Sequence, residues 1–142
     1  MNSVFSVAKF ILERTGEVSA MKLQKLVFYA QAWHMVWEEE PLFEEDFQAW
    51  ANGPVVPELY AKHRGMFLVD SSLFADAEDV SGNVVDNIDK VLGFYGEKSG
   101  HWLSNLTHSE RPWLDARGDT EIGERSEALI SKAAIAEYYG SL

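Results

Sequence analysis

The side chains best suited to chemistry in this sequence are its four histidines and one nearby glutamate. The histidines are His34, His63, His101 and His108, and Glu110 follows the last of them by two residues. A loop could bring an imidazole and a carboxylate at this spacing to one metal ion, as a metal-dependent hydrolase requires. Residues two apart do not share a helix face, and no second histidine stands at the i, i+4 spacing of zinc hydrolases. A hydrolase using His108 and Glu110 is therefore the alternative function, not the first.

No other catalytic motif supports an enzyme. The sequence contains no His-Glu-x-x-His, no glycine-rich Walker loop and no Gly-x-Ser-x-Gly. It also has no cysteine, which excludes thiolate metal sites and disulfides. We therefore expect no catalytic residue, no metal and no cofactor, and a protein that acts by binding.

The element that must position many of the remaining polar side chains is a predicted helix over residues 21–37. Its apolar stripe, at helical spacing, consists of Leu23, Leu26, Val27, Ala30, Trp33 and Trp37. Its other side is also apolar from Phe28 onward, and helices that are hydrophobic all round are usually buried. Ser19 is a good N-cap because its hydroxyl can accept a bond from a free first-turn N–H. The sequence thus predicts a buried central helix.

Polar residues on this helix have two interpretations. Gln24 and Gln31 lie two turns apart, and Lys25 and Tyr29 form an i, i+4 pair. Buried amides and hydroxyls need hydrogen-bond partners, so these side chains could tie down the irregular turn at residues 52–54. They could instead form a polar patch in a groove for a partner. We favour the first interpretation for Gln24 and leave Gln31 and Tyr29 open.

Other segments also have helical spacing. They cover residues 3–15, 57–64 with Pro57 at the first position, 84–95, a short helix capped by Ser99, and a last helix capped by Ser131.

His34 lies on the central apolar stripe and is expected to be a hydrogen-bonded core histidine. We predict an all-α fold in a single domain over residues 1–142, with five or six helices around the central one. The alternation near residues 42–51 allows a small hairpin. Residues 66–82 are expected to form a long mobile loop that leaves room for a short turn around Leu73-Phe74.

Charge narrows the choice of partner. The formal net charge is −11, which opposes binding to nucleic acid and favours the approach of a basic partner. The sequence shows neither a leader peptide nor an apolar run of membrane-spanning length. We expect a cytoplasmic protein that binds neither nucleic acid nor a membrane.

Five tryptophans are many for 142 residues. Tryptophan is common both in cores and at the energetic centres of interfaces. Trp50 and Trp113 lie in turn-rich stretches, which makes them the better interface candidates.

These pieces together resemble one family. The carrying motifs are Lys22-Leu23-Gln24-Lys25-Leu26, Tyr29-Ala30-Gln31-Ala32-Trp33-His34, Pro41-Leu42-Phe43, Ala49-Trp50, Gly53-Pro54-Val55-Val56-Pro57 and Tyr60. Later matches are Tyr95-Gly96, Leu103, Leu106-Thr107-His108, Glu110, Pro112-Trp113, Ala116-Arg117, and residues 130–139. With these motifs the chain resembles the SocA-like antitoxin family, also called the Panacea domain.

The resemblance implies a mostly helical antitoxin of a bacterial or prophage toxin–antitoxin pair. Members of the family neutralise toxins of unrelated folds, generally by direct contact, and one member delivers its toxin to an AAA+ protease. The partners expected here are therefore a cognate protein toxin and, in the adaptor case, such a protease. The oligomeric state stays open.

Two groups of residues follow as site predictions. The expected partner-binding residues are Trp50, Tyr60, Trp113 and Arg117, with Tyr29, Gln31 and His108 as polar supports. The motif residues expected to hold the fold are Leu23, Gln24, Lys25, Leu26, Trp33, Gly53, Pro54 and Pro57.

Overall fold

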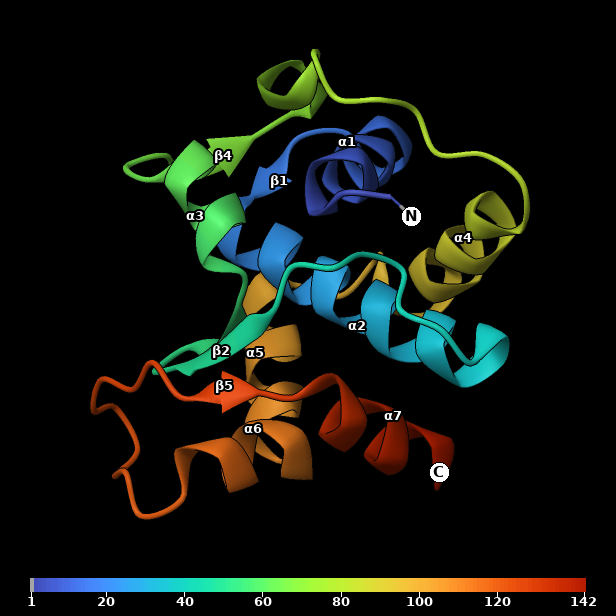
Figure 1. Cartoon of the computed structure of the whole chain (residues 1–142). Coiled ribbons are helices and arrows are strands. Elements are labelled where there is room, and N and C mark those ends of the chain that lie inside the picture. The colour runs from blue at the N-terminus through green and yellow to red at the C-terminus, as the bar shows by residue number, and fades with distance from the viewer. Residues whose placement is uncertain (1) are drawn as a thin grey trace.

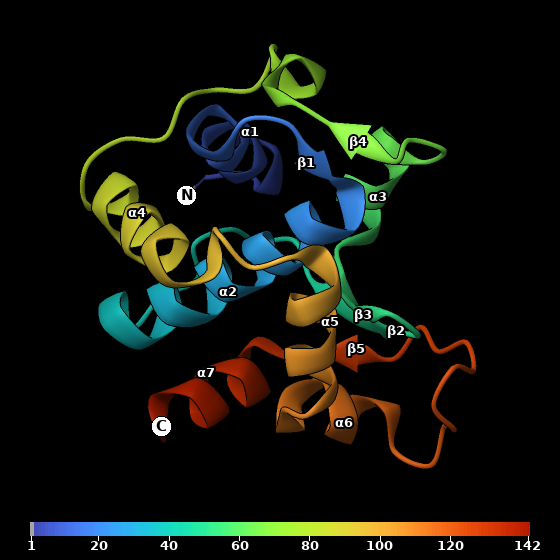
Figure 2. The same cartoon turned by 180° about the vertical axis from the view of Figure 1, so that it is seen from behind.

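The computed structural model describes residues 2–142 and is built around one long helix, α2 (Ala20–Glu38). Helices α1, α4, α5 and α7 all pack against α2, with α1 above it in Figure 1 and α7 below it. Figure 2 shows α5 crossing the opposite face of α2. The predicted central helix is therefore confirmed, and Ser19 caps it by accepting the backbone N–H of Lys22.

The N-terminal part joins a helix to a very short sheet. Helix α1 (Val4–Thr15) ends at Gly16, whose φ of 76° suits glycine. Strand β1 (Val18–Ser19) then pairs antiparallel with β4 (Leu68–Val69). This pairing brings the segment after residue 65 alongside the start of α2.

A second small sheet lies on another side of α2. Its strand order is β3-β2-β5, where β2 is Phe47–Trp50, β3 is Gly53–Val55 and β5 is Leu129–Ile130. Both pairings are antiparallel. Helix α3 (Pro57–His63) follows β3 directly, with Pro57 at the start of its first turn as predicted.

The remaining helices complete the shell around α2. The 3₁₀ helix η1 (Ser71–Phe74) packs on α1, and α4 (Asn83–Tyr95) packs on α2. Helices α5 (Gly100–His108), α6 (Arg111–Arg117) and α7 (Lys132–Gly140) follow. Ser99 and Ser131 cap α5 and α7 through their side chains, as the sequence predicted.

The predicted all-α class is wrong, because five strands in two antiparallel sheets accompany seven α-helices in the described residues. The strands are two to four residues long, which is too short for an alternating pattern to stand out in the sequence. The hairpin also lies later than expected, at residues 47–55. The stretch from residue 66 to residue 82 contains β4, which was not predicted, and η1, which coincides with the expected turn around Leu73-Phe74.

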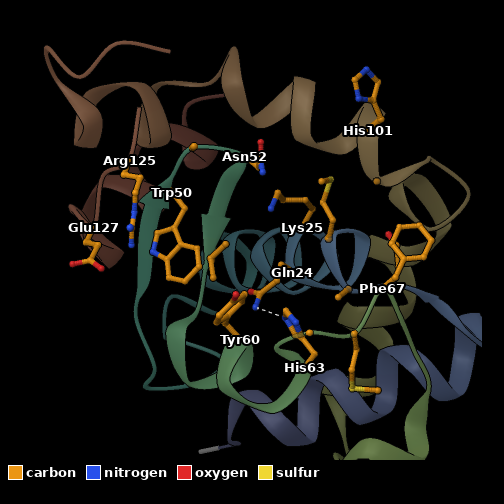
Figure 3. A pocket seen from close by; sticks show the side chains of 18 of the residues that line it. Gln24, Lys25, Trp50, Asn52, Tyr60, His63, Phe67, His101, Arg125 and Glu127 are labelled. Atoms are coloured by element: carbon orange, nitrogen blue, oxygen red, sulfur yellow. Dashed lines mark hydrogen bonds between the residues drawn. The ribbon is translucent and has the colours of Figure 1, made fainter. Parts of the chain in front are cut away.

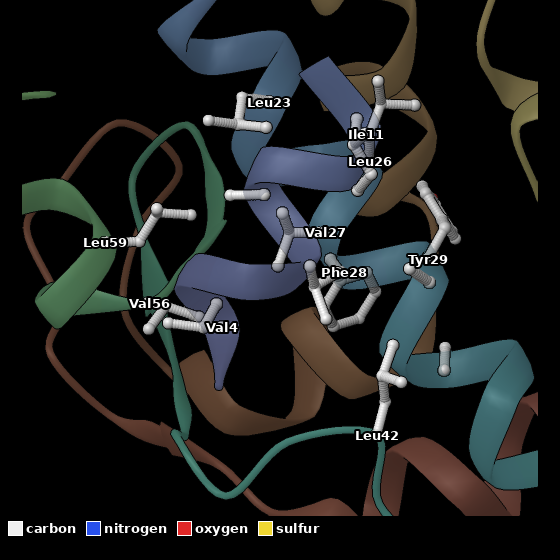
Figure 4. Close-up of a cluster of buried hydrophobic side chains, with 14 of the residues drawn as sticks. Val4, Ile11, Leu23, Leu26, Val27, Phe28, Tyr29, Leu42, Val56 and Leu59 are labelled. Atoms are coloured by element: carbon white, nitrogen blue, oxygen red, sulfur yellow. The ribbon is translucent and has the colours of Figure 1, made fainter. Parts of the chain in front are cut away.

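The core gathers around α2, which is buried on nearly every side. Figure 4 shows side chains of α1 and α2 packed against Leu42, Val56 and Leu59. Phe28 makes edge-to-face contacts with Phe47 and Tyr139. The predicted apolar stripe is exposed to solvent at its C-terminal end, where Trp37 is 42% exposed.

Candidate functional site

A cavity of about 720 Å³ opens beside the first turns of α2. Its walls come from α2, the β2–β3 hairpin, α3, the segment before β4, the start of α5 and residues 125–127 (Figure 3). The short β1–β4 sheet and the hairpin bring these distant segments together. A volume of this size is within the range of sites that bind ligands or protruding side chains.

Aromatic and sulfur-containing side chains make much of the lining apolar. Trp50 and Tyr60 meet edge to face with ring centroids 5.0 Å apart. Phe67, Met66 and Met21 also line the cavity, and the Phe67 residue is 79% exposed. Exposed apolar side chains grouped at a hollow are typical of a binding surface.

Gln24 fixes the backbone on one side of the cavity. Its Oε1 accepts the Val56 N–H at 3.0 Å, and its Nε2 donates to the Val56 carbonyl oxygen at 3.4 Å. The same Nε2 lies 3.0 Å from Nε2 of His63, whose pKa burial lowers. Gln24 therefore holds the backbone at Val56, and not the turn at residues 52–54 as predicted.

Lys25 is a buried lysine in the cavity wall. The residue is 1% exposed, and its Nζ donates to the Pro54 carbonyl oxygen at 3.3 Å. Burial without a compensating negative charge lowers the Lys25 pKa to about 7. Gly53 makes this packing possible, because a Cβ there would lie 2.5 Å from Cε of Lys25. The φ of Gly53, 123°, also excludes ordinary side chains.

Strand β2 is fastened from behind by α6. The indole N–H of Trp113 donates to the Trp50 carbonyl oxygen at 2.8 Å, and Arg117 Nη1 donates to that of Ala49 at 3.0 Å. The Arg117 guanidinium lies 4.8 Å from the centre of a Trp113 ring, and His108 stacks on that tryptophan at 4.1 Å. These contacts fix Trp50 at the cavity through its backbone.

A buried carboxylate before α6 connects two further elements. Oε1 of Glu110 accepts the hydroxyls of Tyr29 and Tyr139 at 2.6 and 2.7 Å. Burial raises the Glu110 pKa despite these two bonds. Glu110 thereby links α2 and α7 to the turn before α6.

The structure separates the predicted partner-binding residues into two groups, with His108 in neither. Trp50 and Tyr60 line the cavity, half-buried. The side chains of Tyr29, Gln31, Trp113 and Arg117 are buried and, unlike that of Lys25, do not line the cavity, so a partner in the cavity would not meet them. His108 is half-buried, and its Nε2 has no hydrogen-bond partner among residues 2–142.

The motif residues expected to be structural are in the interior or at its edge. Leu23 and Leu26 are fully buried, and Trp33 is half-buried with its indole N–H donating to the Tyr95 hydroxyl at 3.0 Å. His34 is buried, and its Nδ1 lies 3.3 Å from Nδ2 of Asn87. The interpretation of His34 as a hydrogen-bonded core histidine is therefore confirmed.

Several cavity residues were not among the predicted partner-binding residues. They are Met21, Met66, Phe67 and Arg125, together with His63 and His101, which the sequence offered only as general candidates for chemistry. The apolar pair Met66-Phe67 directly after Gly65 was the available signal, since connections are usually polar. No group of three His, Asp or Glu side chains that could hold a metal occurs in the part of the chain described, 2–142. In that same part, no helix has both the length and the apolarity to cross a bilayer.

Comparison with known families agrees with the resemblance. The family model for the SocA-like antitoxin, Panacea domain, matches residues 23–114. The chain belongs to this family. The matched Panacea region runs from α2 through the β2–β3 hairpin to α6, and therefore includes Trp50, Tyr60 and Lys25. No curated protein and no solved structure matches the chain.

Proposed function

We propose that this protein is the antitoxin of a toxin–antitoxin pair and neutralises a cognate protein toxin by direct binding. Membership in the SocA-like antitoxin family supports an antitoxin role in general terms. The observation that carries the binding mode is the cavity lined by Trp50 and Tyr60. In this proposal the protein acts in the cytoplasm and performs no chemistry of its own.

The proposed contact surface has large, positioned aromatic side chains and exposed apolar area, as binding hot spots do. Trp50 and Tyr60 are large and held in place by each other. Phe67 at the same cavity is largely exposed, so it can bury apolar area when a partner arrives. Aromatic anchors set in a pocket and surrounded by water-excluding neighbours dominate the energy of many interfaces.

Charge favours the encounter with a basic toxin. The net charge of −11 creates a field that attracts a cationic protein from a distance. Acidic side chains at Glu44 and Glu45 border a second, smaller hollow near β2. They would mainly raise the rate of association, which falls as salt screens the charges.

The test is rescue of growth. The chain is co-expressed with the product of the adjacent gene, and growth and complex formation are measured. Wild type should rescue, while Trp50→Ala and Tyr60→Ala should weaken binding by about 2 kcal/mol or more, as loss of a hot spot does. A melting curve for each variant shows whether it remains folded.

Trp37→Ala is the matched control, because Trp37 is an exposed tryptophan at the far end of α2. It should rescue like wild type. Full rescue by folded Trp50→Ala and Tyr60→Ala would refute the cavity as the binding surface. Toxin levels that fall when the antitoxin is present, and recover when an AAA+ protease is deleted, would identify the protein as a protease adaptor.

A further inference from the structure

Basic side chains outnumber acidic ones around this cavity, unlike in the protein as a whole. The chain as a whole carries −11, yet Lys25, His63, His101 and Arg125 line this cavity beside a single acid, Glu127. Figure 3 shows Lys25 extending from α2 toward Asn52, between the histidines and the hairpin. An acidic protein has thus gathered cationic and potentially cationic groups around one hollow.

Lys25 is a buried group in this cavity with unused bonding capacity. An ammonium has three N–H donors, and in the described residues Nζ has one acceptor, the Pro54 carbonyl oxygen. No salt bridge of the described residues involves Lys25. A buried charge without a counter-ion lowers stability, so its place in the wall of a binding cavity calls for a partner that supplies the missing acceptor.

We propose that the cavity receives an apolar segment of the toxin that carries one glutamate, and that this carboxylate pairs with Lys25. The inference rests on the proposed antitoxin function and names the feature of the toxin that the site recognises. Trp50, Tyr60 and Phe67 would enclose the apolar part of the segment. The ammonium of Lys25 would donate to the carboxylate in surroundings that exclude water, where such a bond is strong.

Two charge patterns then act at different ranges. The acidic outer surface attracts a basic toxin, while the cavity accepts only a negative group. A partner that is basic all over can approach but leaves Lys25 unpaired. Binding therefore selects a basic protein with one suitably placed acidic residue. A partner without that residue binds less tightly, because it leaves Lys25 buried and unpaired.

The first experiment removes the amino group of Lys25 and keeps an unbranched side chain of similar length. Lys25→Met retains a similar unbranched, apolar side chain and eliminates the buried ammonium. We expect a melting temperature close to or above that of wild type and at least tenfold weaker binding to the toxin. Lys90→Met, at an exposed lysine on α4, is the control and should leave binding unchanged. Unchanged binding by folded Lys25→Met overturns the proposal.

The second experiment needs no toxin. The probes are the peptide N-acetyl-Leu-Phe-Glu-amide and its glutamine counterpart, added at millimolar concentration to wild-type protein. Nitrogen-detected NMR of the Lys25 side chain follows its pKa, which burial places at about 7. A carboxylate seated beside the ammonium stabilises the charged form, so the glutamate peptide should raise this pKa and the glutamine peptide should not.

The two experiments separate failure of the site from failure of the proposed function. If wild type does not rescue growth but the glutamate peptide raises the Lys25 pKa, the antitoxin role is wrong and carboxylate recognition stands. If wild type rescues but neither peptide changes the pKa, the carboxylate proposal is wrong. A larger shift with 3-phenylpropionate than with the peptide would assign the cavity to a small organic acid instead, and would overturn the proposal as well.

Discussion

Gln31 offers the sharpest test of whether a polar side chain on the central helix serves the fold or a partner. The residue is 1% exposed, and its side chain bonds the backbone of two successive residues, Leu42 and Phe43, in the segment after α2. Its Oε1 accepts the Leu42 N–H at 2.7 Å, and its Nε2 donates to the Phe43 carbonyl oxygen at 3.0 Å. Gln31→Leu removes both bonds while changing the volume little.

The expected loss follows from the two backbone groups left behind. A buried donor or acceptor without a partner costs about 1–3 kcal/mol, so two of them together cost about 2–6 kcal/mol. Added apolar burial by leucine offsets about 1 kcal/mol. We therefore expect a loss near 3 kcal/mol, a large part of the roughly 5–15 kcal/mol that stabilises a typical domain.

Urea unfolding followed by tryptophan fluorescence measures this loss as a lower midpoint at unchanged slope. Gln48→Leu is the matched control, because within residues 2–142 Oε1 of Gln48 accepts a single bond, from the part-buried Trp50 indole N–H at 2.8 Å. That variant should lose less than about 1 kcal/mol.

Gln31→Glu adds a test by pH. An ionised carboxylate could still accept from Leu42, but it would repel the Phe43 carbonyl oxygen, so its pKa should be raised in the folded state. The variant should be nearly as stable as wild type in acid and should lose stability as pH rises through that raised pKa. A Gln31→Leu variant within about 0.5 kcal/mol of wild type, yet defective in toxin binding, would refute the structural role and make Gln31 a contact residue.

Three further predictions concern the interior. Burial raises the Glu110 pKa above its ordinary 4.5. The contribution of Glu110 to the free energy of unfolding is therefore complete in acid and declines as pH rises through the raised pKa. Over that pH interval the urea midpoint of Glu110→Gln should rise relative to that of wild type, and a constant difference between the two midpoints would contradict this. Gly53→Ala would place a Cβ 2.9 Å from Oγ1 of Thr107 in addition to its contact with Lys25, so calorimetry should show a loss of about 2–4 kcal/mol. Trp113→Ala should cost about 3–5 kcal/mol and fail in growth rescue by unfolding, which a melting curve detects; a folded Trp113→Ala that fails only in binding would restore it as an anchor.

Local signals determined most of the helices. Ser19, Ser99 and Ser131 accept first-turn N–H groups as their positions predicted, because capping depends on residues within one turn. Helical periodicity located α2, and Pro57 marked the start of α3, for the same reason. The motifs around α2 and the hairpin also indicated the family, and with it the antitoxin role in general terms.

Tertiary structure decided the strands and the site. A two-residue strand such as β5 forms because β2 lies beside it, and nothing in its own sequence signals that pairing. Trp50 and Trp113 lie in similar turn-rich stretches of the sequence. In the fold, Trp113 on α6 is buried against β2, whereas Trp50 lines the cavity. The sequence determined which side chains prefer apolar surroundings, whereas long-range packing determined which of them found such surroundings within the fold and which were left at the surface for a partner.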